Sequence, residues 1–235
     1  MILDIHSHIL PNIDDGSQSV AMSVEMLKIM KNQGVDAVIA TPHFYGDCNT
    51  TSSFLEKREF AREKMMNEYD ELTMPEVFIG AEVRYFRGIT KSDALSKFTL
   101  GKSSYILLEP PFAAFTQYMI DEIQSFASNG QYIPIIAHVE RYLCFDSWKN
   151  IIALFDRGNI KGQINAGSLL KFSTKKRTLR LLSDGFCQYI AGDTHNLWDR
   201  APCIDRGCEI AESKLSQSVL NKLADEAEIL YKKLK

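Results

Sequence analysis

Short apolar runs that recur along the chain, each followed by a stretch with helical spacing, constrain the fold more than any other feature of this sequence. In the helical stretches, such as residues 19–34, apolar positions recur every three or four residues and Gly34 marks the end. Repeated strand–helix units predict an α/β fold, either a closed (β/α) barrel or an open doubly wound sheet. The apolar runs cover residues 2–6, 35–43, 77–83, 104–111, 132–140, 161–167 and 187–195.

The sequence shows no internal boundary. It has no Pro/Gly/Ser-rich linker and no abrupt change in composition, and its 235 residues suffice for one barrel with a substantial core. We therefore expect a single domain over residues 1–235. Its last element is predicted to be an amphipathic outer helix at roughly residues 205–234.

Composition excludes several classes of protein. The net charge of −3 gives no reason to expect nucleic acid as a partner, because such binding usually rests on a basic face. No apolar run is long enough to span a bilayer, and the start lacks the features of a signal peptide, so we expect a cytoplasmic protein without membrane insertion. The 5 cysteines form no CxxC pair, and none is followed six residues later by an arginine. Phosphatase chemistry in this chain would therefore need a nucleophile other than cysteine.

Histidines and carboxylates gather at the ends of the predicted strands. In a βα-barrel the carboxyl ends of all strands open on one face, so residues far apart in the sequence converge there. Each residue alone is explained by a structural hydrogen bond. A metal site explains all of them together, because cations offset the cost of burying several carboxylates. The residues are His6, His8, His43, Glu82, Glu109, His138, Asp193 and His195.

The pair His6 and His8 is the most specific local signal. Alternation along a strand places both imidazoles on one face, where they point at a single ion. Mixed histidine and carboxylate ligation suits zinc, manganese or iron, and a set without cysteine disfavours a purely structural zinc site. So many ligands exceed what one ion can use. Two or three ions that share a bridging carboxylate are therefore predicted, which is the geometry used for phosphoester hydrolysis.

Six sequence segments extend this pattern from residue 2 to about residue 200. In order, they are HSHILPNIDDG, ATPH, GAEVR, AHVER, QINAGSL and GDTHN. In this order they resemble the bacterial PHP-superfamily protein tyrosine phosphatases, which are encoded with capsule and exopolysaccharide loci. The resemblance implies a distorted (β/α)7 TIM-like barrel, the PHP fold, with a trinuclear site. Such sites typically hold manganese, although iron or zinc can occupy them.

The resemblance also allots the ligands to three ions. Asp15 enters through the family pattern alone; from the residues themselves, the IDDG segment is equally well a turn in which Asp14 or Asp15 caps the following helix. The first ion would be held by His6, His8, Glu82 and Asp193. The second would share Glu82 and also bind Glu109 and His138. The third would be held by Asp15, His43 and His195.

Two arginines, Arg141 and Arg200, complete the resemblance, because family members use arginines at these places to hold the phosphate. A guanidinium fork matches the oxygens of a phosphoryl group and stays charged at any working pH. The chain departs from the family pattern at Val139, where proline is usual, and at Tyr142, where asparagine is common. It also has GDTH in place of the more usual SDAH. These changes remove no ligand, but Val139 and Tyr142 bear on the loop that carries Arg141.

The functional hypothesis is metal-dependent hydrolysis of phosphotyrosine, in which a hydroxide that bridges two ions attacks phosphorus in line. The resemblance implies that the substrate is a tyrosine-phosphorylated protein, namely an autophosphorylating bacterial tyrosine kinase, and that the enzyme regulates capsular or exopolysaccharide synthesis. Aromatic side chains near the ligand loops either form walls for the substrate ring or pack in the core. They are Phe44, Tyr45, Phe112 and Phe115.

Three alternatives stay open on sequence grounds. A PHP enzyme that acts on a small phosphoester, with histidinol phosphate as the obvious candidate, would share the metal site. A metallohydrolase of the amidohydrolase type also opens with a His-x-His pair on a barrel strand. A catalytically silent metal-binding adaptor would bind metal without phosphatase activity.

Overall fold

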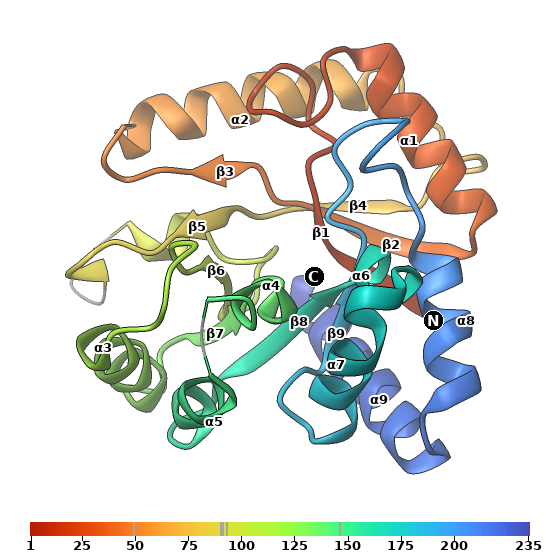
Figure 1. The fold of residues 1–235 in the computed structure, drawn as a ribbon. Helices are drawn as coiled ribbons and strands as arrows, with labels where there is room; N and C mark the ends of the chain where they lie inside the picture. Colours follow the sequence, from red (N-terminus) through yellow and green to blue (C-terminus); the bar gives the residue numbers. More distant parts are fainter. Residues whose placement is uncertain (49, 90–91, 93, 146) are drawn as a thin grey trace.

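The chain forms a curled parallel sheet with helices on its outside (Figure 1). The computed structural model describes residues 1–48, 50–89, 92, 94–145 and 147–235. The described strands pair with one another in parallel throughout. Parallel strands joined by helices are the arrangement that the alternating sequence pattern predicts.

Two of the predicted strands are each divided into two shorter strands. The second consists of β2 (Val35–Ala40) and β3 (His43–Phe44), and the third of β4 (Glu76–Ile79) and β5 (Glu82–Arg84). β2 pairs with β4 and β3 with β5, so the two broken strands stay side by side across the interruption. Pro42 lies at one break and has no N–H to give to the sheet. In each case the strand before the break packs within the barrel, and the strand after it begins with a predicted ligand, His43 in β3 and Glu82 in β5.

The remaining strands complete a ring. β1 pairs with β2, and the strands after β5 follow it in chain order. At the carboxyl ends the ring closes: His8 N donates to Thr194 O at 2.8 Å, and Asp193 N donates to His6 O at 2.8 Å. With each broken strand counted once, the described residues provide seven strand positions, which confirms the predicted distorted (β/α)7 barrel. The strands not yet given bounds are β1 (Ile2–Ser7), β6 (Tyr105–Glu109), β7 (Ile133–Ile136), β8 (Lys161–Asn165) and β9 (Tyr189–Ala191).

Helices follow the strands and cover the outside of the ring (Figure 1). The first, α1, begins where Ser19 Oγ accepts from Met22 N at 3.1 Å, and the chain turns at Gly34 with φ 80°, as the sequence indicated. No helix in the described part of the chain is long and apolar enough to cross a membrane. The helices are α1 (Val20–Asn32), α2 (Thr51–Met66), η2 (Leu95–Lys97), α3 (Gln117–Ser128), α4 (Val139–Tyr142), α5 (Trp148–Phe155), α6 (Ala166–Leu170), α7 (Phe172–Ser183), α8 (Ile204–Lys214) and α9 (Gln217–Leu234).

The prediction of one outer helix over residues 205–234 is wrong. The backbone is extended at Leu215, and Ser216 Oγ accepts from Val219 N at 3.4 Å, which starts a separate helix, α9. α9 lies at the amino-terminal end of the barrel, where its Leu230 and Leu234 are buried among side chains from β1, β2, β6, β7 and β9. Because α9 covers that end, the carboxyl ends of the strands form the accessible face.

Candidate metal centre and active site

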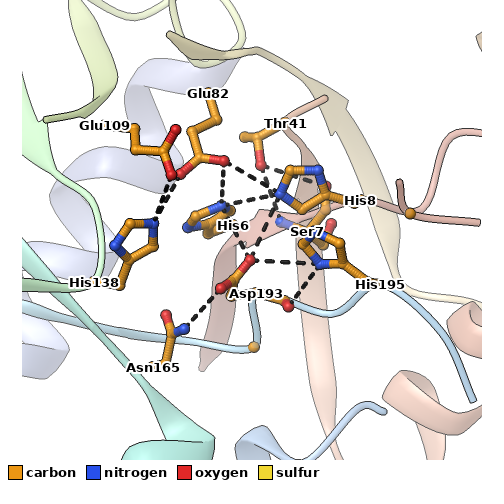
Figure 2. A network of polar contacts seen from close by, with 12 residues as sticks. His6, Ser7, His8, Thr41, Glu82, Glu109, His138, Asn165, Asp193 and His195 are labelled. Carbon is orange, nitrogen blue, oxygen red and sulfur yellow. Dashed lines mark hydrogen bonds and ion pairs between the residues drawn. The ribbon is translucent and has the colours of Figure 1, made fainter. Parts of the chain in front are cut away.

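All of the predicted ligands meet at the carboxyl ends of the strands. Figure 2 shows those that are labelled there: His6, His8, Glu82, Glu109, His138, Asp193 and His195. His6 lies near the end of β1, Glu82 opens β5, and Glu109 ends β6. The others stand on the loops that follow β1, β7 and β9 or at the start of β3. Most of these side chains are buried, whereas the Asp15 side chain is 64% exposed. The prediction that they converge from distant parts of the sequence therefore holds geometrically.

Glu82 lies in the middle of the cluster and turns its two oxygens toward different histidines. Oε1 is 3.1 Å from Nε2 of His138. Oε2 is 3.2 Å from Nε2 of His6 and 3.4 Å from Nε2 of His8. It also lies 2.9 Å from Nδ1 of His43. These contacts agree with the predicted role of Glu82 as a carboxylate shared by two ions.

Three groups of ligand atoms lie close enough together to hold one ion each, with all atoms of a group within 4.8 Å of one another. One group matches the ligands implied for the first ion except that Glu82 is not counted in it. Another matches the ligands implied for the third ion, with His8 added. The remaining group corresponds to the second ion, with His43 in place of His138. Nε2 of His138 nevertheless lies 3.5 Å from Oε1 of Glu109. The groups are His6, His8 and Asp193; His8, Asp15, His43 and His195; and His43, Glu82 and Glu109.

The donor atoms of the cluster fit divalent ions. Glu109 Oε2 and His195 Nε2 are buried and have no hydrogen-bond partner among the described residues. The Nε2 atoms of His6 and His8 face each other at 3.2 Å. Buried polar atoms normally have partners, and an ion between these ring nitrogens and carboxylate oxygens would provide them.

Asp14 and Asp15, which the sequence did not separate, have different surroundings. Asp14 Oδ2 accepts from Nδ1 of His8 at 2.8 Å and from the backbone N of His43 at 3.0 Å. Asp14 therefore orients His8 so that its Nε2 faces the cluster. Asp15 Oδ1 lies 3.4 Å from Nε2 of His43 and 3.5 Å from Nε2 of His195, which is the position of a ligand.

A chain of amides supports the cluster from β8, and sequence reasoning gave it no role. Gln163 Oε1 faces Nδ1 of His6 at 3.2 Å and accepts from the backbone N of His138 at 2.8 Å. Gln163 Nε2 donates to Asn165 Oδ1 at 2.7 Å, and Asn165 Nδ2 donates to Asp193 Oδ2 at 2.7 Å. The available signal was alternation, since two polar residues two positions apart at a strand end share one face.

The two predicted phosphate-binding arginines converge on one carboxylate. Arg141 Nη2 donates to Asp193 Oδ2 at 2.6 Å, and Arg200 Nη2 donates to Asp193 Oδ1 at 2.7 Å. Both side chains are about one-third exposed, at 33% and 32%. Each guanidinium is thus fixed at one nitrogen and keeps further N–H groups for an anion.

The two departures from the family pattern hold the loop of Arg141 in place. Val139 and Tyr142 are both fully buried at the two ends of α4. Tyr142 OH donates to Pro110 O at 2.8 Å, which ties α4 to the end of β6. The two side chains therefore anchor the short helix, with Arg141 directed at Asp193.

Charge coupling within the cluster is strong. Burial alone would lower the pKa of His8, but the neighbouring carboxylates raise it to about 10. The same balance raises the pKa of His138 to about 9. Burial would raise the pKa of Asp193, but His6 and Arg141 lower it. Without metal, these shifts favour the protonated forms of His8 and His138, and a proton must leave each ring nitrogen that comes to bind an ion.

Two candidate ligands have a left-handed backbone, which is uncommon for residues other than glycine. His138 has φ 36° and Asp193 has φ 50°. Such conformations cost of order 1–3 kcal/mol and persist where surrounding structure enforces them, commonly at functional sites. At Asp193 the hydrogen bond from its N to His6 O, which closes the barrel, enforces the conformation.

A cavity of about 180 Å³ opens above the cluster and is lined by charged and aromatic side chains. Tyr45 stacks on His43 with ring centroids 5.1 Å apart. Phe112 stacks on His138 at 5.6 Å and is 44% exposed. Phe44 and Phe115, in contrast, are buried in the core. The lining residues are Asp15, His43, Tyr45, Glu82, Arg84, Glu109, Phe112, His138, Arg141, Asp193 and Arg200.

A barrel that gathers histidines, carboxylates and arginines at the carboxyl ends of its strands is the architecture of a metal-dependent hydrolase. Comparison with known proteins gives the family. Residues 2–230 match the family described as capsular polysaccharide synthesis, CpsB/CapC, and the chain belongs to this family. The resemblance inferred from the sequence segments is confirmed.

Several relatives cover almost the whole chain. The tyrosine-protein phosphatase YwqE of Bacillus subtilis is 28% identical over 98% of this chain and 92% of its own length. The tyrosine-protein phosphatase CpsB of Streptococcus pneumoniae is 32% identical over 91% of this chain and 90% of its own length. A crystal structure from work on these two enzymes, which describes them as metal-dependent tyrosine phosphatases, superposes with a TM-score of 0.85. It covers 100% of this chain and 96% of the other, at 27% identity.

More distant structures share the fold alone. The phosphotriesterase homology protein of Escherichia coli superposes with a TM-score of 0.53 at 13% identity, covering 94% of each chain. A D-hydantoinase gives a TM-score of 0.53 at 11% identity. These two likenesses agree with a barrel of the TIM type.

Proposed function

We propose that this chain is a metal-dependent protein-tyrosine phosphatase that acts on a phosphotyrosine protein and thereby regulates capsular or exopolysaccharide synthesis. The observation that carries the proposal is a single one: a buried cluster of histidines and carboxylates shares one cavity with Arg141 and Arg200. Membership of the CpsB/CapC family and the names of its relatives support the choice of phosphotyrosine as substrate.

The proposed ligands hold two or three divalent ions, with Mn²⁺ as the first choice and iron or zinc as alternatives. When bound, these ions supply an activated water as the nucleophile and neutralise charge on the phosphoryl oxygens. The proposed ligands are His6, His8, Asp15, His43, Glu82, Glu109, His138, Asp193 and His195.

Arg141 and Arg200 bind the phosphoryl group from one side. Each donates one N–H bond to Asp193, which fixes the guanidinium plane and leaves other N–H groups for the phosphoryl oxygens. Charge that develops on these oxygens in the transition state meets donors that are already in place.

Tyr45 and Phe112 form walls for the phenyl ring of the substrate. Both rings line the cavity, and each is stacked on a histidine of the cluster, which fixes its orientation. A tyrosine leaving group, with a pKa of about 10, departs more readily than a serine alkoxide, so a strong general acid is less necessary. This agrees with a chain whose 5 histidines all lie in the cluster.

The partner that we propose is an autophosphorylating bacterial tyrosine kinase, and the proposed location is the cytoplasm. A kinase that phosphorylates its own tyrosines offers the phosphomonoester that this site would bind. The net charge of −3 gives no electrostatic reason to expect nucleic acid as a partner.

The test is hydrolysis of a phosphotyrosine peptide by protein that has been stripped of metal and then supplied with Mn²⁺, Fe²⁺ or Zn²⁺. Arg141→Ala is the informative variant, and Arg157→Ala, at an exposed position just after α5, is the matched control. Histidinol phosphate serves as the competing substrate. We expect metal-dependent release of phosphate from the peptide, lost in Arg141→Ala and kept in Arg157→Ala.

Other outcomes would overturn the proposal in distinct ways. Faster hydrolysis of histidinol phosphate than of any peptide would indicate a small-molecule phosphoesterase. Bound metal without hydrolysis of either substrate would indicate a silent adaptor.

A further inference from the structure

A third arginine, Arg84, lines the cavity of the metal cluster together with Arg141 and Arg200. It belongs to the GAEVR segment, but neither the ligand pattern nor the phosphate-binding pair gives it a role. The three arginines differ in what holds them. Arg141 and Arg200 both donate to Asp193, so much of their charge is already compensated.

Arg84 has no carboxylate within 4.0 Å among the residues that the structure describes. Its guanidinium carbon lies 5.5 Å from the centroid of the Tyr45 ring, within the range of a cation–π contact. Arg84 is partly buried and lines the cavity, and no ion pair joins its guanidinium to a carboxylate within the described part of the chain. An uncompensated guanidinium in a cleft is a ready binding group for an anion.

Strand geometry places Arg84 further from the ions than the phosphate-binding pair. Glu82 and Arg84 are two residues apart on β5, so their side chains share a face. At about 3.3 Å per residue, Arg84 lies roughly 6.6 Å further along the strand, toward the mouth. Glu82 contacts the histidines at the bottom of the cavity, whereas Arg84 lies beside Tyr45, near its rim.

We propose that Arg84 is a subsite for an acidic residue that flanks the phosphotyrosine of the substrate, an inference that rests on the proposed function. With the phosphoryl group at the cluster and the phenyl ring between Tyr45 and Phe112, the peptide backbone leaves the cavity at the rim. A carboxylate one or a few residues from the phosphotyrosine then meets Arg84. The site accordingly selects acidic phosphotyrosine segments.

The test compares two phosphotyrosine peptides that differ only in their flanking residues, Asp and Glu in one and Asn and Gln in the other. Wild type should favour the acidic peptide in kcat/KM by about five- to tenfold at low salt, a typical contribution of a charged contact. Arg84→Gln should bring this ratio close to one, mainly through KM, and Arg84→Lys should retain part of it.

Arg87→Gln is the matched control. Arg87 lies three residues further along, with its guanidinium 4.4 Å from the Tyr118 ring, but it does not line the cavity. We expect this variant to keep the wild-type ratio. Metal content and melting temperature, measured for each variant, establish that the fold and the cluster are intact.

The outcomes separate the two proposals. If wild type hydrolyses both peptides without preference, or if Arg84→Gln keeps the preference, the subsite is wrong and the phosphatase stands. If Arg84→Gln loses activity equally on both peptides, Arg84 acts on the phosphoryl group and the flanking subsite is wrong. If wild type hydrolyses neither peptide with any metal, the proposed function itself fails.

Discussion

Replacing Asp15 with asparagine should remove one metal ion from the cluster while leaving the stability of the metal-free fold nearly unchanged. The Asp15 side chain is 64% exposed, and its Oδ1 lies 3.4 Å from Nε2 of His43 and 3.5 Å from Nε2 of His195. Ion pairs with so exposed a carboxylate contribute little to folding, so the free energy of unfolding should change by no more than about 0.5 kcal/mol. An asparagine lacks the negative charge of the carboxylate and binds a divalent ion far less well.

Replacing Asp14 with asparagine should instead lower the stability of the metal-free fold and weaken metal binding without removing a ligand. The Asp14 side chain is 6% exposed and accepts from His8, from Gly16 N at 2.9 Å and from His43 N. An asparagine offers one oxygen in place of two, so at least one of these donors loses its acceptor. An unpartnered buried donor costs about 1–3 kcal/mol, which for a chain of this length lowers the melting temperature by roughly 2–12 °C. Loss of the carboxylate that orients His8 should also weaken metal binding by about 10- to 100-fold.

The assay combines metal counting with melting. Each protein is stripped of metal and equilibrated with Mn²⁺ at a series of buffered free concentrations, and the bound metal is counted by elemental analysis. The melting temperature of the stripped protein is measured separately. Asp15→Asn should bind fewer ions than wild type at every concentration, with an unchanged melting temperature. Asp14→Asn should regain the wild-type number at high concentration but melt earlier. The reverse result, with Asp14→Asn permanently short of one ion, would refute the assignment of Asp15 as the ligand.

Three further predictions concern the closure of the barrel and the protons of the cluster. Gly192→Ala places a methyl group 2.6 Å from the buried Asp4 carboxylate and should lower the free energy of unfolding in urea by about 1–3 kcal/mol; an unchanged midpoint would contradict this packing. Leu230→Ala should cost about 2–5 kcal/mol in the same experiment, because the side chain is fully buried at the closed end of the barrel; a surface-like effect would show that α9 does not cover that end. Because carboxylates raise the pKa of His8 to about 10 and that of His138 to about 9, metal binding should release protons and strengthen as pH rises from about 6 to about 8; calorimetry in buffers of different ionisation enthalpy would detect no release if the histidines were already neutral.

The position of the ligands could be predicted from the sequence because it depends on topology. Parallel strands send their carboxyl ends to one face, so Glu82, Glu109 and Asp193 had to meet once the strands were recognised. The interruption of two of these strands was not predicted. Both runs are predominantly apolar, and a break that two neighbouring strands share depends on their pairing in the sheet rather than on the local sequence of either run.

The residues that support the ligands were harder to find. Asp14, Gln163 and Asn165 are of types that occur commonly in turns and at strand ends, and only their contacts with His8, His6 and Asp193 reveal their role. The same holds for the break before α9. Ser216 caps the start of α9, but in the sequence it cannot be told from an exposed serine within a helix until the extended backbone of Leu215 is known.

Asp193 connects the metal cluster, the phosphate-binding arginines and the closure of the barrel. Its Oδ1 lies 3.4 Å from Nε2 of His6, while its two oxygens accept from Arg200 and Arg141. Its backbone, at φ 50°, is held by the hydrogen bond from Asp193 N to His6 O in β1. Loss of this carboxylate should therefore lower the metal content and also raise the inhibition constant of inorganic phosphate. Arg141→Ala should raise that inhibition constant without lowering the metal content. An Asp193→Asn protein with full metal content and unchanged phosphate inhibition would contradict both roles, because neither the ions nor the two arginines would then depend on this carboxylate.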